Sequence, residues 1–492
     1  MANEPAGRPP WRTLLDEAAS LRDLHGDSRV WELSSHHRDG RPPRLFLDPC
    51  GASVASMREW ASLRCRLAGQ QGRHWSSAPR SLMVSGLVQT GKTYTLNEVL
   101  PAVLAEALRA QPPDHPLAAM AVLRLNCLSL KLRAGAEGLL FSLLAEMMGW
   151  AEDARVPAPV LVLVDELQAL LQPTTMNGRP DGTELDAAGG AYLRDGLLRQ
   201  LLVAGPRHVL LALTGSGMAA VWGALAAMPV GGAAPLHCVR VVNLPSSSPP
   251  DLMLRLLEHS LPLWGLEAGD GGDVGGGIKA ELMAWSGGSP ALCTALAEGW
   301  ISSGGGGGGG GPLAAYAPHF LRDELHAEVE VAWARSLAHL TNPQRGALLD
   351  LCCPELGACA DDIADTGLWR FLQPHLTATA ATAAAQDGGG SGGYFYLGDA
   401  SQRQLLRTAI ARYAGQLQRT GGWAGGLDSL EAGGLTLAQL DWGWQLLRLG
   451  EVAKHLQGAT GGGGGGGAGA DLSANMVLGV TEFTAMLEAR AG

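Results

Sequence analysis

Short apolar runs alternate with longer stretches of helical periodicity between about residues 46 and 300. This alternation is typical of repeated strand–helix–strand units and predicts an α/β fold with a mostly parallel sheet flanked by helices. The apolar runs that predict buried strands are Ser81–Ser85, Ala121–Cys127, Val160–Asp165, His208–Thr214 and Cys238–Val242.

Helical spacing predicts the segments that connect these strands. Apolar residues recur every three or four positions from Leu96 to Leu108, directly after the first strand, and further helices are predicted at 137–150 and 192–204. Pro101 lies inside the first of these helices. We expect a kink there, because an interior proline lacks the amide donor and crowds the preceding turn.

Glycine tracts divide the rest of the chain. Gly304–Gly311 and Gly461–Gly467 predict linkers or loop expansions, since polyglycine buries nothing and loses the most entropy on ordering. A third soft stretch, rich in Ala and Thr and then in Gly and Ser, runs from Ala378 to Gly393. The predicted segments are 1–45, 46–244, 245–303, 304–312, 313–418 and 419–492.

Composition narrows the function classes. Hydrophobic residues make up 46% of the 492 residues and charged residues 17%, which excludes a wholly disordered chain. The net charge of −11 opposes general binding to a phosphate backbone, so nucleic acid is not a favoured partner.

The start of the chain and its cysteines bear on location. Glu4, Asp16 and Glu17 stand near the N-terminus without an apolar core, so we expect an intracellular protein, cytoplasmic or nuclear, whose eight cysteines are reduced. The stretch His208–Val239 carries no Lys, Arg, Asp or Glu and could suggest a membrane span. Glycine and proline interrupt it, and it predicts a buried strand followed by an apolar helix.

The segment Gly86–Thr93 (GLVQTGKT) fits the Walker A pattern GxxxxGK[ST] between a predicted strand and a predicted helix. Glycines let backbone N–H groups wrap phosphates, the ammonium of Lys92 can reach the β and γ oxygens, and the hydroxyl of Thr93 can bind Mg²⁺. Lys92 is one of only four lysines in the chain, which makes a chance match less probable.

The run Val160–Glu166 (VLVLVDE) is a buried strand that ends in two carboxylates, a Walker B pattern. In a parallel sheet its C-terminal end faces the same edge as the phosphate loop, where Asp165 can hold a metal and Glu166 can take a proton from water. The next strand ends in Thr214 and is followed by Gly215-Ser216-Gly217. These hydroxyls could face the same edge or cap the next helix.

Together these motifs resemble the AAA+ and related signal-transduction (STAND) P-loop ATPases over residues 46–300. The resemblance implies that Thr214 or Ser216 senses the γ-phosphate. Leu125–Leu130 is similar to the second strand of origin-recognition-type initiator ATPases, and Val242–Pro245 to the strand that enters the helical lid. Ala284–Leu292 (AWSGGSPAL) resembles the G-x-P lid element, in which the proline, here Pro290, contacts nucleotide.

The resemblance also implies a helical lid at 245–303 and a small winged-helix-like domain at 313–418. Pro343–Leu349 predicts a helix, and Tyr394–Leu397 a short strand before a helix at 402–413. Departures from the family pattern are Gln89 in place of a common glycine and a lid without the sensor arginine. No arginine-finger motif is identifiable among Arg194, Arg199 and Arg207, so a ring with shared active sites is not predicted.

The sequence therefore predicts a slow ATP-hydrolysing switch with ATP and Mg²⁺ as cofactors. Lys92 and Glu166 are the predicted catalytic residues, and Thr93 and Asp165 the predicted metal ligands. The predicted nucleotide contacts are Gly86, Gln89, Thr90, Gly91, Lys92, Thr93, Thr214, Ser216 and Pro290. The alternatives are a non-catalytic nucleotide-bound scaffold and an initiator-like ATPase associated with DNA.

Overall fold

A computed structural model describes the chain in thirteen ranges and a few isolated positions between 325 and 337. The ranges are 13–34, 43–69, 81–129, 159–170, 175–176, 179–180, 202, 209–227, 238–266, 274–305, 312–321, 340–385 and 393–419. The chain forms two compact units, Met1–Arg403 and Gln404–Gly492, and the first unit holds every described element except the C-terminal part of the last helix. The predicted helix at 137–150, the predicted helix at 192–204 apart from Leu202, the second glycine tract and the tail after Arg419 lie outside the described residues.

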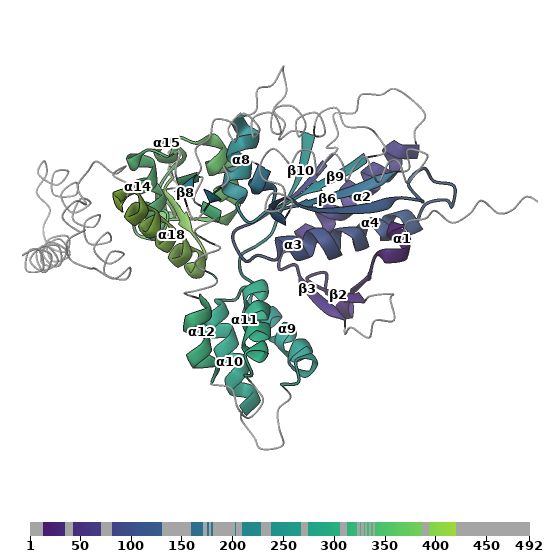
Figure 1. Ribbon diagram of the computed structural model, residues 1–492, viewed down its shortest axis with the longest axis horizontal. Helices are drawn as coiled ribbons and strands as arrows, with labels where there is room; N and C mark the ends of the chain where they lie inside the picture. Colours follow the sequence, from purple (N-terminus) through teal and green to yellow (C-terminus); the bar gives the residue numbers. More distant parts are fainter. Residues whose placement is uncertain are drawn as a thin grey trace, which may run out of the picture. The chain divides into compact units, whose positions relative to one another are not determined.

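Five parallel strands form the central sheet, in the order β10-β4-β9-β6-β5 (Figure 1). They are β4 (Ser81–Ser85), β5 (Ala121–Asn126), β6 (Val160–Asp165), β9 (Val209–Leu213) and β10 (Val239–Asn243). All five strands were predicted to within one residue at either end. The runs are continuously apolar because helices cover both faces of such a sheet, and every residue of β4 and β6 is buried.

One long helical segment follows β4. It consists of α3 (Lys92–Tyr94), a π-helical turn at Thr95–Val99, and α4 (Leu100–Arg109). The predicted apolar stripe from Leu96 to Leu108 is buried against the sheet and against α2 (Ala52–Gly69). The π-helical turn ends at Val99, two residues before Pro101, and the chain stays helical through the proline.

The N-terminal segment contributes a small antiparallel sheet for which the sequence offered no prediction. The helix α1 (Leu14–Glu17) precedes β1 (Ser20–Asp23), the 3₁₀ turn η1 (Leu24–Gly26), β2 (Val30–Ser34) and β3 (Arg44–Leu47). Trp31, Leu33 and Phe46 belong to the same hydrophobic core as α2 and α4. The predicted boundary at residue 45 therefore falls inside β3, in a segment that packs on the core.

Three helices follow β10: α9 (Pro250–Leu263), α10 (Val274–Ser286) and α11 (Pro290–Ser302), and α12 (Leu313–Phe320) packs on α10 and α11 (Figure 1). The first residues of the glycine tract have a structural role at the end of α11. The amides of Gly304 and Gly305 donate to the carbonyls of Ile301 and Trp300, both at 2.9 Å, which satisfies groups that a helix end leaves open.

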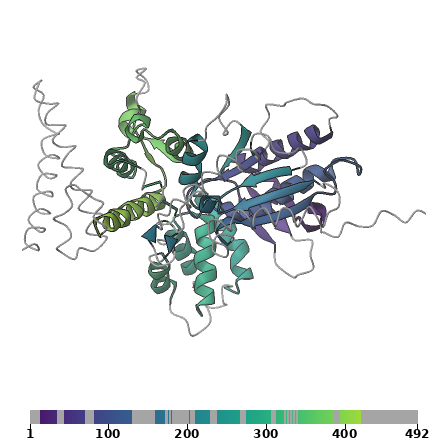
Figure 2. The same cartoon turned by 45° about the horizontal axis from the view of Figure 1, so that its top comes forward.

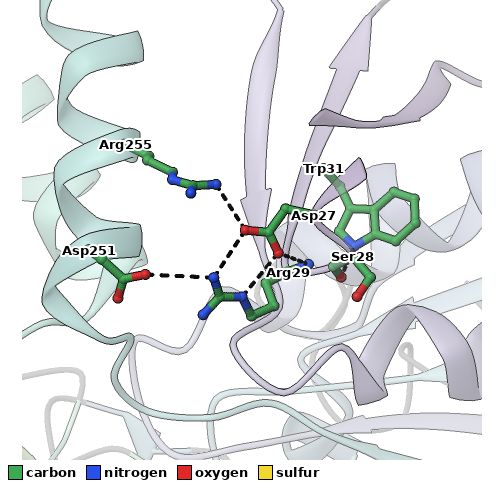
Figure 3. Close-up of polar contacts among 6 residues, drawn as sticks. All are labelled: Asp27, Ser28, Arg29, Trp31, Asp251 and Arg255. Atoms are coloured by element: carbon green, nitrogen blue, oxygen red, sulfur yellow. Dashed lines mark hydrogen bonds and ion pairs between the residues drawn. The ribbon is translucent and has the colours of Figure 1, made fainter. Parts of the chain in front are cut away.

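A network of ion pairs joins the N-terminal sheet to α9 (Figure 3). Asp27, between β1 and β2, accepts from Arg29 at 3.0 Å and from Arg255 of α9 at 2.9 Å, and Arg29 lies 3.7 Å from Asp251. Hydrogen bonds from Arg29 lower the pKa of Asp27 to about 2. Nearby, the His259 ring contacts the carbonyl of Pro43 at 3.0 Å, so α9 is tied to the residue just before β3 as well.

The segment after α12 holds short helices around a two-stranded antiparallel sheet, β11–β12, seen in a second view in Figure 2. Its elements are α14 (Asn342–Asp350), α15 (Ala360–Ile363), α16 (Thr366–Leu372), η7 (Gln373–His375), β11 (Leu376–Ala378), α17 (Ala380–Ala385), β12 (Phe395–Leu397) and α18 (Ala400–Arg419). The strand and helices predicted here are present. The soft stretch from Ala378 is helical in its first half, since alanine has the highest helix propensity.

Smaller elements flank β9 along the chain. A short antiparallel pair, β7 (Thr175–Met176) and β8 (Arg179–Pro180), precedes it, and the helix α8 (Met218–Ala227) follows it and packs against α16. The apolar stretch from His208 thus begins with a buried strand and continues as an apolar helix, as predicted. Within the described ranges, no helix is both long enough and apolar enough to cross a lipid bilayer.

Candidate functional site

The phosphate-loop motif occupies the turn between β4 and α3, as predicted. Gly91 is the residue before α3 and has φ of +80°, a conformation that side chains rarely adopt. Gln89 also lies in the left-handed region, with φ of +57°, at the position where the resembling families often have glycine. The sharp loop that the glycine pattern predicts is therefore present, with one strained non-glycine residue in it.

Lys92 begins the helix and is buried. Its ammonium donates to the Leu87 carbonyl of the loop at 2.5 Å, and the Thr90 hydroxyl donates to the same carbonyl at 3.0 Å. A buried ammonium is costly unless anionic or polar groups surround it. The loop thus concentrates a positive charge at the N-terminal end of a helix that runs to Arg109, where anions are favoured.

Asp165 ends β6 next to this loop. Burial raises the pKa of Asp165, while the Glu166 amide, the Thr93 hydroxyl and the Lys92 charge act in the opposite direction. The Glu166 amide donates to Asp165 Oδ1 at 2.8 Å. The structure therefore brings Thr93, Asp165 and Lys92 together, three of the residues that the motifs singled out.

Glu166 has left-handed backbone geometry, with φ of +55°. Such a conformation in a residue with a side chain costs free energy and persists only where surrounding contacts impose it. One carboxylate oxygen, Oε2, accepts from the Ser216 hydroxyl at 2.9 Å and from the Gln168 amide. Gln168 was not predicted as a site residue, although it stands only two positions after Glu166.

The two hydroxyls predicted at the end of β9 have different partners. Thr214 is fully buried and donates to the Val84 carbonyl of β4 at 2.8 Å, so its hydroxyl joins two strands of the sheet. Ser216 contacts Glu166, and α8 begins two residues later at Met218. Of the two residues named for sensing the γ-phosphate, Ser216 is the one in contact with the predicted catalytic carboxylate.

The start of α11 lies against the phosphate loop. Ser289 caps α11 by accepting from the Leu292 amide at 3.3 Å, and its hydroxyl donates to the Gln89 carbonyl at 2.8 Å. Pro290 is the first residue of this helix, and Ala291 faces Gly91. The Gly-Gly-Ser-Pro element is therefore next to the loop, and Ser289 is the residue of this element whose contact was not predicted.

Two residues from the segment after α12 are linked to the loop, one by a hydrogen bond and one by the charge of Lys92. Gln402 of α18 is buried and donates to the Val88 carbonyl at 2.8 Å. The pKa of His375 is lowered to about 4 by burial and by the Lys92 charge, and its Nε2 atom is buried without a hydrogen-bond partner among the described residues. Neither residue carries a local signal in the sequence, because both are far from the loop along the chain.

The residues present fit a magnesium–nucleotide complex. Among the residues that the structure describes, no group of three or more His, Cys, Asp or Glu side chains could hold a metal alone. A hydroxyl and a carboxylate in contact, Thr93 and Asp165, are oxygen ligands of the kind that Mg²⁺ takes while phosphates and water complete its shell. The buried Lys92 ammonium supplies a positive charge for an anion.

Comparisons with known proteins assign no family. No protein-family model matches the chain, and no curated protein matches it either. Among solved structures, it is similar to the Walker-type ATPase PABY2304 of Pyrococcus abyssi, with 15% sequence identity over 71% of this chain and 95% of that chain. The TM-score is 0.35, a value at which the likeness says nothing about activity. The described residues themselves show an α/β fold with a phosphate-loop motif at the edge of a parallel sheet.

Proposed function

We propose that this chain binds Mg·ATP at the loop Gly86–Thr93 and hydrolyses it slowly, as a switch of the AAA+/STAND type. The observation that supports the proposal most is the convergence of Lys92, the Thr93–Asp165 pair and Glu166 at the C-terminal ends of two strands. In open α/β sheets ligands bind at this edge.

Each residue has a defined task in the proposed mechanism. Lys92 and the loop amides neutralise the phosphate oxygens, while Thr93 and Asp165 hold the metal, which supplies electrostatic stabilisation of the charge on the transferred phosphoryl group. Glu166 orients the attacking water and takes its proton. An arginine finger is worth about 10³ to 10⁵ in rate, and the sequence offers no identifiable one, so we expect slow basal turnover.

The switch part of the proposal rests on what surrounds the loop. The carbonyls of Gln89 and Val88 accept hydrogen bonds from Ser289 and Gln402, which belong to the proposed lid and to the proposed winged-helix-like segment. A loop that changes shape on binding or releasing phosphates alters both contacts together. The nucleotide state would in this way reach the helices at 245–303 and at 313–418.

Thermal unfolding with and without Mg·ATP tests binding. A ligand that binds only the folded state raises stability, so millimolar Mg·ATP is expected to raise the Tm of the wild type and leave Lys92→Ala unchanged. Lys279→Ala is the matched control, since it removes the same charge from α10. An unchanged wild-type Tm would refute the proposed binding.

Single-turnover hydrolysis tests the chemistry. Glu166→Gln keeps size and hydrogen-bonding capacity but cannot accept the proton, so we expect near-normal ATP affinity with turnover lowered by about 10² or more. If Glu166→Gln hydrolyses ATP at the wild-type rate, the general-base role is wrong. If the wild type binds Mg·ATP but never turns it over, the chain is a nucleotide-bound scaffold.

A further inference from the structure

Gln168 connects the two loops that follow β6 and β9. It lies in the 3₁₀ turn η3 (Leu167–Leu170), and its side chain is buried. Its amide nitrogen donates to Glu166 Oε2 and to Ser216 Oγ, the latter at 2.8 Å, and the Ser216 hydroxyl donates to the same Oε2 at 2.9 Å. Gln168, Ser216 and Glu166 therefore form a closed triangle of hydrogen bonds around one carboxylate oxygen.

The loop after β9 is shaped around this side chain. A Cβ atom at Gly215 would overlap Gln168 Oε1, so a larger residue there would require the glutamine side chain to move. The Leu167 amide donates to the Thr214 carbonyl at 3.0 Å, which ties the start of η3 to the end of β9. The position of Gln168 thus depends on both loops, through the Leu167–Thr214 backbone contact and the hydrogen bond from its own amide to Ser216.

The triangle of hydrogen bonds restricts the rotation of the Glu166 side chain and so fixes its carboxylate. A glutamate has several rotatable bonds, and a general base works only when an oxygen lies within hydrogen-bond distance of the proton that it removes. Both donors contact Oε2, so the carboxylate is fixed with Oε1 as the oxygen that neither donor occupies. Gln168 and Ser216 in this way select the orientation of the predicted base.

We propose that Gln168 is a positioning residue that acts on ATP hydrolysis through Glu166, with Ser216 as its partner. This inference rests on the proposed hydrolytic function. It adds that the rate, and not the nucleotide affinity, depends on the amide donor of Gln168. The hydrogen bonds of that donor go to Glu166 and Ser216, neither of which belongs to the phosphate loop or to the Thr93–Asp165 pair.

Removing the donor while keeping the volume tests the role. Gln168→Met is close in size and shape but cannot donate, and Gln111→Met makes the same change at the end of α4, where the Gln111 amide donates to a carbonyl of the helix that it follows. We expect Gln168→Met to lower the single-turnover rate by about 10- to 100-fold with Mg·ATP affinity within about threefold of the wild type. Gln111→Met is expected to match the wild type in both.

Two further variants separate positioning from a merely structural role. Ser216→Ala removes the second donor to Glu166 and one acceptor of the Gln168 amide but leaves the Gln168–Glu166 hydrogen bond in place, and it is expected to lower the rate with the same affinity. In a Glu166→Gln background, Gln168→Met is expected to cause no further loss, because residues that act through one group are not additive. A structural role would instead lower the residual rate again.

These experiments distinguish failure of the positioning role from failure of the proposed function. If the wild type hydrolyses ATP in a manner that depends on Lys92, and Gln168→Met and Ser216→Ala both match it, the positioning role alone is refuted. The positioning role is also refuted if Gln168→Met lowers Mg·ATP affinity as much as it lowers the rate. A further fall in rate when Gln168→Met is added to Glu166→Gln refutes it as well. A wild type that binds Mg·ATP without turnover removes the hydrolytic function and this inference together.

Discussion

Protonation of His375 should destabilise the fold at mildly acidic pH. The ring lies at the end of η7, and its Nε2 atom is buried without a partner among the described residues. Burial is the main cause that lowers the pKa of His375 from 6.5 to about 4, and the positive charge of Lys92 adds to it. The folded chain therefore holds this ring neutral at a pH where the unfolded chain protonates it.

The size of the effect follows from the gap between the folded and unfolded pKa values. A gap from 6.5 to about 4, at about 1.4 kcal/mol per pH unit, corresponds to about 3 kcal/mol in all. Because the folded pKa is the lower one, this stability is fully present above pH 6.5 and is lost as the pH falls toward 4. At pH 5 the loss is about 2 kcal/mol.

Urea unfolding at pH 7.5 and pH 5, followed by tryptophan fluorescence, measures this loss. Between pH 7.5 and pH 5, the free energy of unfolding of the wild type is expected to fall by about 2 kcal/mol more than that of His375→Gln, since glutamine does not titrate. His319→Gln is the control, because His319 is exposed on α12 and should leave the wild-type pH dependence intact.

The ring itself can be followed by NMR, with the signal assigned by its absence in His375→Gln. A titration midpoint well below 6.5 is expected, and Lys92→Met should move it upward by removing the nearby charge. Equal losses of stability in the wild type and His375→Gln, or a ring that titrates near 6.5, would refute the reasoning.

Three further predictions concern the metal site, the ion-pair network and nucleic acid. Asp165→Asn removes a buried charge, so without ligand its Tm should equal or exceed that of the wild type, while Mg²⁺-dependent ATP affinity falls; a lower Tm with intact affinity would contradict this. Arg255→Ala should lower the Tm at low salt and hardly at 1 M salt, where exposed ion pairs are screened, and equal effects at both would argue against the network. Micromolar binding to random duplex DNA at about 0.15 M salt is not expected, given a net charge of −11, and binding isotherms at two salt concentrations check this.

The sequence was most informative where its signal is contiguous. The strand, loop and helix from Ser81 to Leu108 carry their pattern in neighbouring residues, and the structure confirms the strand, the loop position and the buried stripe. The strand Val160–Asp165 was predicted for the same reason, because its first five residues are all apolar, as in a strand buried on both faces of a sheet. The N-terminal sheet was missed, since its short strands alternate only weakly and one pair is separated by residues 35–43.

In the candidate site, too, residues with a contiguous motif were predicted, while residues that depend on distant contacts were not. Lys92, Thr93, Asp165 and Glu166 were predicted from motifs, and the structure brings them to one edge of the sheet. The residues that complete their surroundings were not predicted because their partners are distant along the chain. Gln402 and Val88 are separated by 314 positions, a pairing for which no local pattern exists.

The sequence by itself determined which residue types stand at the phosphate loop and at the end of β6, because local geometry and buried apolar runs leave their mark on neighbouring positions. It also determined the parallel α/β architecture, through the alternation of strand and helix patterns. Only the tertiary structure decided that Ser216 rather than Thr214 contacts Glu166, and that Gln168 holds them together. A side chain's partner depends on how separate segments pack, and packing is set by the whole chain rather than by any window of it.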